Sequence, residues 1–162
     1  MRKAVALLAG IAILAAANWG IVARERHIAE GRRVFLELAP VDPRSLMQGD
    51  YMALRFKVAN DVQRHGHATE DGRLVVRLDP RGVGEFARRD AGAALAPDEV
   101  ALRYRVREGR VKFASNAFFF QEGSAKLYEP ARFGEFRVDR SGELLLTGLR
   151  GKDLEPLGPP RR

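Results

Sequence analysis

The residues of this sequence that could do chemistry are few, and the histidines come first because they can bind a metal or carry a proton. His65 and His67 stand two residues apart, so on a strand both would face the same side and could contact one zinc ion. A zinc site needs a third and usually a fourth ligand, and the segment around this pair is polar and typical of an exposed loop. His27 is the remaining histidine and the sequence has no cysteine, so we expect neither a metal site nor a bound cofactor.

A serine nucleophile activated by a lysine is the second chemistry that the residue types allow. Signal-peptidase-like serine proteases are membrane-anchored β proteins in which a Gly-Asp pair follows the nucleophile, and here Ser45 precedes Gly49 and Asp50. The Ser-Met-x-Pro pattern of those enzymes is missing, and the downstream lysines that could serve as the base are Lys112 and Lys126. We therefore expect Ser45 to occupy a turn, and we keep an envelope hydrolase or signal-peptidase-like serine protease as the alternative function.

The basic residues are scattered through the strand-like segments, so we expect mainly a solvated basic surface, with an anionic partner as the alternative. Glu122, Glu129 and Glu135 lie close along the chain, but nothing in their spacing places two of them in one cleft. The net charge is +7, which favours partners such as lipid head groups. Arginines flank a tyrosine over residues 103–105, as in some nucleic-acid-binding hairpins. Because a membrane-anchored chain is not expected to meet nucleic acid, we expect lipid and no nucleic acid.

Residues 4–23 carry no charge, so this segment is a candidate membrane-spanning helix. As a helix this run would be about 30 Å long, the thickness of the hydrocarbon core of a bilayer. Trp19 lies near its far end, where an indole suits the interface. We therefore predict a transmembrane signal anchor over residues 1–24. A signal peptide cleaved after Ala17 is the alternative, although the apolar run continues beyond the length that such a peptide needs.

Basic residues at both ends of this helix bear on the side of the membrane where the remaining chain lies. Counting them places that part in the cytoplasm, because more of them follow the apolar run than precede it. A short basic segment ahead of an apolar core instead resembles an export signal, and on this ground we predict an exported domain. The residues counted are Arg2 and Lys3 on one side and Arg24, Arg26, Arg32 and Arg33 on the other.

Beyond the anchor the sequence changes from a helical to a strand-like pattern. Residues 25–33 are polar and are predicted to form a juxtamembrane stalk that can prolong the helix. Residues 34–150 repeatedly alternate apolar and polar positions, as in the strand expected over residues 51–58, which is the pattern of half-buried strands. Seven such strands joined by short turns predict a mainly β fold, an antiparallel sandwich or partly open barrel preceded by one N-terminal transmembrane helix.

The connecting segments are predicted from their turn-forming and polar residues. We expect an exposed loop over residues 60–72, a short helix around residues 83–89 and a helical turn within residues 124–133. The proline- and glycine-rich residues 151–162 are expected to be a disordered tail. The sequence shows no internal repeat.

Residues 49–56, Gly-Asp-Tyr-Met-Ala-Leu-Arg-Phe, resemble the signature of the GDYxxLxY family of bacterial proteins. Phe56 stands where the signature ends in tyrosine, which keeps the ring and loses the hydroxyl. Residues 118–139 resemble a second block of that family, and the likeness runs from the anchor to about Leu149. The resemblance implies a small bacterial protein with an N-terminal membrane segment and no catalytic assignment. Related genes often accompany multi-pass membrane proteins, so the resemblance also implies an integral membrane protein as partner.

The two blocks contain the residues that we expect to form a surface for that partner. Gly49 can take a positive φ in a tight turn, and Asp50 can accept backbone hydrogen bonds there or pair with Arg44. Tyr51 points away from the apolar face of its strand, so it is free to line a groove. We expect the two blocks to lie side by side. The predicted surface comprises Arg44, Gly49, Asp50, Tyr51, Gln121, Glu122 and Tyr128.

Together these observations predict a single-pass protein of the bacterial inner (cytoplasmic) membrane with its β domain in the periplasm. We expect an accessory or interaction module rather than an enzyme. Its expected partners are membrane lipid and a multi-pass membrane protein.

Overall fold

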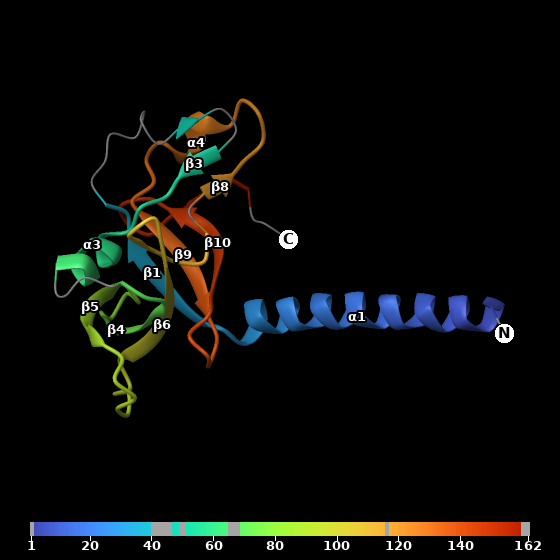
Figure 1. Cartoon of the computed structure of the whole chain (residues 1–162). Helices are drawn as coiled ribbons and strands as arrows, with labels where there is room; N and C mark the ends of the chain where they lie inside the picture. The colour runs from blue at the N-terminus through green and yellow to red at the C-terminus, as the bar shows by residue number, and fades with distance from the viewer. Residues whose placement is uncertain (1, 40–46, 49–50, 65–68, 116, 160–162) are drawn as a thin grey trace.

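The computed structural model describes residues 2–39, 47–48, 51–64, 69–115 and 117–159 of the chain (Figure 1). A long N-terminal helix stands away from a β domain that holds the rest of the described chain. The helices are α1 (Arg2–Glu30), α3 (Lys57–Arg64) and α4 (Ala125–Tyr128). The strands are β1 (Arg32–Glu37), β2 (Met47–Gln48), β3 (Tyr51–Ala53), β4 (Gly72–Leu78), β5 (Gly84–Arg89), β6 (Glu99–Arg107), β7 (Arg110–Lys112), β8 (Ala117–Phe119), β9 (Phe133–Val138), β10 (Leu144–Arg150) and β11 (Pro156–Leu157).

Helix α1 is long and apolar enough to cross a bilayer, as its uncharged sequence predicts. Within Leu7–Glu30, an 18-residue stretch has a mean hydropathy of 1.7, and none of that stretch is buried against the β domain. Trp19 is 80% exposed, so its indole is free to contact lipid. The helix runs on through most of the predicted stalk and ends at Glu30, and β1 begins two residues later.

The β domain consists of two curled antiparallel four-stranded sheets and one smaller sheet. The strand orders are β1-β9-β10-β11 and β5-β4-β6-β7, and the three-stranded sheet has the order β2-β3-β8. The four-stranded sheets curl around one apolar core, which includes Leu36, Leu102 and Phe136, all fully buried. The predicted mainly β class, with an apolar helix before it, is therefore confirmed.

Two hairpins of the same construction join the four-stranded sheets, and they show a repeat that the sequence analysis missed. In the β4–β5 hairpin and the β9–β10 hairpin, Gly82 and Gly142 both have φ of +84° at the turn. The Gly82 carbonyl accepts a hydrogen bond from the Phe35 N–H of β1 at 2.9 Å, and the Gly142 carbonyl accepts one from the Arg103 N–H of β6 at 2.7 Å. Each hairpin turn is thus held by a strand of the other sheet.

An aspartate organises each of these two turns. Asp79 accepts the backbone N–H groups of Arg81 and Val83, both at 2.8 Å. Asp139 accepts the backbone N–H and the hydroxyl of Ser141 at 2.8 and 2.7 Å. Burial raises the pKa of both carboxyls, but these hydrogen bonds lower it by more, so the net pKa of each lies below its ordinary value.

We predict that stability falls in acid as these aspartates become protonated. A carboxyl whose pKa is lowered by folding stabilises the fold above its unfolded pKa of about 3.9. That contribution is lost as the pH falls through the folded pKa, so the thermal midpoint should drop below about pH 4. The Asp139→Asn variant should show a shallower drop in a series of melts at different pH. The Asp153→Asn variant is the control, because the Asp153 carboxylate holds no such turn, and an unchanged slope in Asp139→Asn would contradict the prediction.

Three connecting segments differ from their predicted structure. Residues 57–64 form α3 and not the end of a strand followed by a loop, because Val58, Ala59 and Val62 bury one helical face against the core. Residues 84–89 form β5 and not a helix, because they pair with β4 along its length. In the predicted disordered tail, Leu157 of β11 pairs with Leu149 of β10. The helical turn expected within residues 124–133 is present as α4.

Candidate functional site

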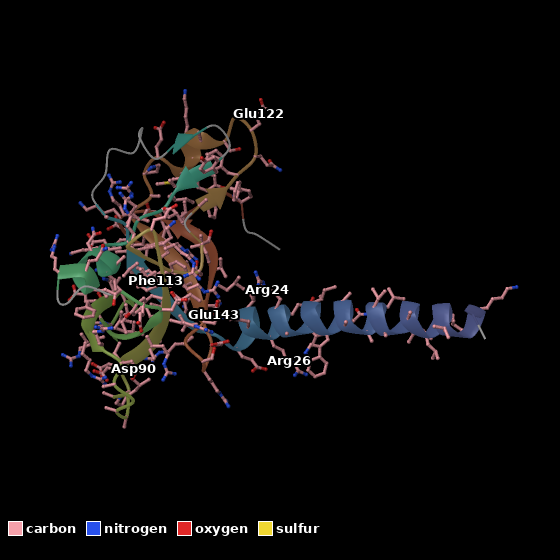
Figure 2. The ribbon with its side chains drawn as sticks, in the orientation of Figure 1. Arg24, Arg26, Asp90, Phe113, Glu122 and Glu143 are labelled. Carbon is pink, nitrogen blue, oxygen red and sulfur yellow. The ribbon has the colours of Figure 1, made fainter. Side chains whose placement is uncertain are left out.

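The family-like motif divides into a buried half and a half that reaches the surface. Leu54 and Phe56 are 4% and 3% exposed. The Phe56 ring meets the rings of Phe113 and Phe136 edge-on, with centroids 6.2 and 5.2 Å away. The last aromatic position of the motif therefore packs in the core (Figure 2 labels Phe113 inside the domain). Arg44, Gly49 and Asp50 lie outside the described residues, so their predicted roles stay predictions.

The structure brings the motif next to the second block of sequence. Strand β3 pairs antiparallel with β8, which places Tyr51 opposite Phe119. The two rings are in contact, with centroids 5.6 Å apart. Gln121 and Glu122 follow β8 in an exposed turn, and Figure 2 shows Glu122 at the outer edge of the domain.

Tyr128, another predicted surface residue, is mostly buried. It is 5% exposed and packs edge-on to Phe118 and stacked on Phe120, with centroids 5.0 and 5.3 Å away. Tyr128 therefore supports the chain beneath the exposed turn, since it offers little area to a partner.

The surface that these blocks form is apolar and exposed, which the sequence analysis did not identify. We call the strands β2, β3 and β8 together with α4 the flap. Phe119 of β8 is 65% exposed and Leu127 of α4 is 52% exposed. A run of three phenylalanines at residues 118–120 was the available signal. Because strand neighbours face opposite sides, Phe118 is buried and Phe119 is not.

A groove of about 460 Å³ lies between the domain end of α1 and the sheet β1-β9-β10-β11. Its floor includes Glu135, a buried carboxylate that accepts hydrogen bonds from the Arg150 guanidinium at 2.7 and 2.5 Å. The pair neutralises itself, so it adds no net charge to the groove. Other groove residues are Arg24, Ile28, Tyr128, Arg137, Leu145 and Leu157.

Helix α1 is fixed to the domain by His27 and the strand that follows it. His27 Nε2 donates to the Arg137 carbonyl at 2.9 Å, and its Nδ1 lies 4.0 Å from an Asp139 carboxylate oxygen. Arg137 in turn donates to the Gly31 carbonyl at 3.3 Å. Beside this contact lies a second hollow of about 870 Å³, which contains residues of both charges, including Arg26 and Glu30.

The described residues contain no cluster of side chains that could hold a metal ion. Among them, no three histidine or acidic residues gather as a metal site would require. Lys112 lies 3.6 Å from Glu108, and Lys57 donates to Glu37 at 3.0 Å, a hydrogen bond that raises the Lys57 pKa and so keeps it protonated. His65, His67 and Ser45 lie outside the described part of the chain, so the hydrolase alternative gains no supporting geometry.

A long apolar N-terminal helix that is fixed to a curled β domain, with a groove beside it, defines this molecule as a mainly β protein with one candidate membrane-spanning helix. Within that class, the chain belongs to the GDYXXLXY protein family, whose model matches residues 13–149. Comparison with curated proteins and with solved structures gives no significant match.

Proposed function

We propose that the protein is a single-pass, membrane-anchored accessory module whose exported domain docks onto an integral membrane protein through the flap. The observation that carries this proposal is the ring of Phe119, 65% exposed and in contact with the half-buried Tyr51. Exposed apolar patches rimmed by polar residues are typical of interaction sites, and aromatic side chains are enriched at their centres. Both family-like blocks contribute to this one surface.

The position of the flap supports a partner that is itself in the membrane. In Figure 1, β8 lies on the side of the domain from which α1 leaves. Because α1 is exposed along its apolar length, it is free to pack against lipid or against a transmembrane helix. A membrane protein could therefore contact α1 and the flap together.

Export to the periplasmic side of the inner membrane is part of the proposal. The short basic segment before the apolar run supports it, while the basic residues after the run argue against it. Alkaline phosphatase fused to the C-terminus folds only outside the cytoplasm, so the fusion should be active in cells. An inactive fusion, with the protein present in membranes, would place the domain in the cytoplasm.

We predict that Phe119 is an anchor of the docking surface. The Phe119→Asp variant should bind the partner about 30-fold more weakly, because losing a central aromatic contact costs about 2 kcal/mol or more. The partner is first captured in intact cells by a photoreactive residue at position 119, followed by purification of the adduct from membranes. Binding is then measured with the two purified proteins in detergent.

The matched control for this experiment is Ala87 of β5. Ala87 is also exposed, and β5 lies on the side of the domain away from α1 (Figure 1). A photoreactive residue at position 87 should capture none of the protein captured at 119. Equal capture at both positions, or none at 119, would count against docking through the flap.

A further inference from the structure

Three arginines at or near the groove at the end of α1 have no acidic partner in the described part of the chain. Among the described residues, no ion pair includes Arg24, Arg33 or Arg137, although the structure has thirteen ion pairs. On the other four-stranded sheet six strand arginines are ion-paired: Arg73, Arg77, Arg88, Arg103, Arg105 and Arg107. Arg24, Arg33 and Arg137 therefore add positive charge, without an acidic partner among the described residues, where α1 meets the domain.

The strand register places these cations on one face of the sheet. Arg137 of β9 is opposite Arg33 of β1 and opposite Leu145 of β10, so the three side chains leave the same face in one row. Arg24 approaches the groove from α1, one turn before Ile28. Glu135, the buried carboxylate that lines the groove, is already bound by Arg150 and does not offset them.

The depth of the groove relative to α1 indicates what these cations meet. Arg24 is the first residue after the uncharged run, so in a bilayer it lies at the level of the head groups. The groove wall also presents Ile28, Leu145 and Leu157, which are apolar. A positive rim beside an apolar wall at this depth is complementary to an anionic lipid.

We propose that the groove binds an anionic phospholipid of the adjacent leaflet. Its phosphate lies between Arg24 and Arg137, because a guanidinium donates two parallel hydrogen bonds to phosphate oxygens. The polar head group lies on the domain side of the phosphate, beside Ile28 and Leu145, and the acyl chains run along α1 toward the bilayer core. This inference rests on the membrane anchoring in the proposed function, and is independent of docking through the flap. Such a lipid would fix the domain on the membrane surface and so hold the flap toward its partner.

The test uses the full chain, purified and placed in nanodiscs that contain equal amounts of phosphatidylcholine and phosphatidylglycerol. A photoreactive residue at Leu145 reports which lipid occupies the groove, by the mass of the adduct. We expect about fivefold more phosphatidylglycerol adduct than phosphatidylcholine adduct. This ratio corresponds to the preference for anionic lipid that one arginine near a membrane surface contributes. A photoreactive residue at Ala87 should give no lipid adduct.

Variants at Arg24 test the cations without disturbing the helix contact, which Arg137 helps to form. Arg24→Gln should bring the two adducts close to equal, and Arg24→Lys should keep most of the preference. Arg103→Gln, which removes a cation that is paired with Glu143 on the other sheet, should keep the full preference.

Three results would overturn the proposal: equal adducts in the parent protein, loss of the lipid adduct when soluble glycerol phosphate is added, or an adduct between two copies of the chain. The second would mark a site for a soluble anion, and the third a dimer interface. Because the phosphatase fusion and the Phe119 experiment do not involve the groove, each of these results would leave the proposed function standing.

Discussion

Replacing Glu135 with alanine should lower the free energy of unfolding by about 3–5 kcal/mol, because it leaves the half-buried Arg150 guanidinium without its counter-charge. Glu135 is 7% exposed, and both contacts to Arg150 are short, at 2.7 and 2.5 Å. The measurement is pulse proteolysis of the full chain in detergent along a urea series. With a slope of about 1–3 kcal/mol per molar urea, the midpoint should fall by roughly 2 M.

Glu143 provides the matched control for this prediction. It also pairs with arginines, Arg103 at 3.7 Å and Arg105 at 3.5 Å, but all three side chains are more than a third exposed. Glu143→Ala should therefore cost less than about 1 kcal/mol. Replacing both Glu135 and Arg150 with methionine should recover much of the loss, because neither charge is then buried alone. Equal losses for Glu135→Ala and Glu143→Ala would contradict this account of the groove floor.

The parts of the fold that the sequence predicts well are those fixed by local pattern. The uncharged run of residues 4–23 is sufficient to specify α1, because each of its side chains suits the same apolar surroundings. The alternation around Leu102 is likewise sufficient to specify β6, whose alternate residues Leu102 and Tyr104 are buried. In both cases the order of apolar and polar residues along the chain matches the surroundings that the element has in the fold.

The segments that differ are those where tertiary packing decides. Val58 continues the alternation of the motif, yet it belongs to a helical face with Val62, since the chain turns into α3 after Phe56. Gly84 weakens any local preference of β5, and its lack of a side chain allows Val76 and Leu36 to approach, within 3.2 and 3.3 Å of where a Cβ would lie. Neither contact can be inferred from a single segment.

The repeated hairpins and the groove show two further limits of sequence reasoning. The related segments Val-Arg-Leu-Asp before Gly82 and Phe-Arg-Val-Asp before Gly142 are visible in the sequence once their shared turn is known. The groove has no local signal at all, because α1, β9, β10 and β11 each contribute a wall. The flap could be predicted in part. Its two blocks are recognisable in the sequence, but the pairing of β3 with β8 that joins them is not.

Phe56→Ala should also lower the free energy of unfolding by about 3–5 kcal/mol, the usual cost of deleting a buried ring. The ring is held on two sides by Phe113 and Phe136, and on a third by Gly134, where an added Cβ would lie 2.8 Å from it. Gly134→Ala alone should cost about 1–3 kcal/mol through overpacking. In the Phe56→Ala background the same methyl enters the vacated space, so the two changes should couple by about 1 kcal/mol or more.

The Phe119→Ala variant separates packing from binding within the same family-like blocks. Phe119 is 65% exposed, so its truncation should change the free energy of unfolding by less than about 0.5 kcal/mol. The same truncation should weaken binding of the proposed partner. If Phe119→Ala destabilised the domain as much as Phe56→Ala, or if the double change at 56 and 134 were additive, the division of the motif would be wrong. The expected result assigns the Leu54–Phe56 half of the motif to the core. Contact with the proposed partner is then left to the flap, which includes Tyr51.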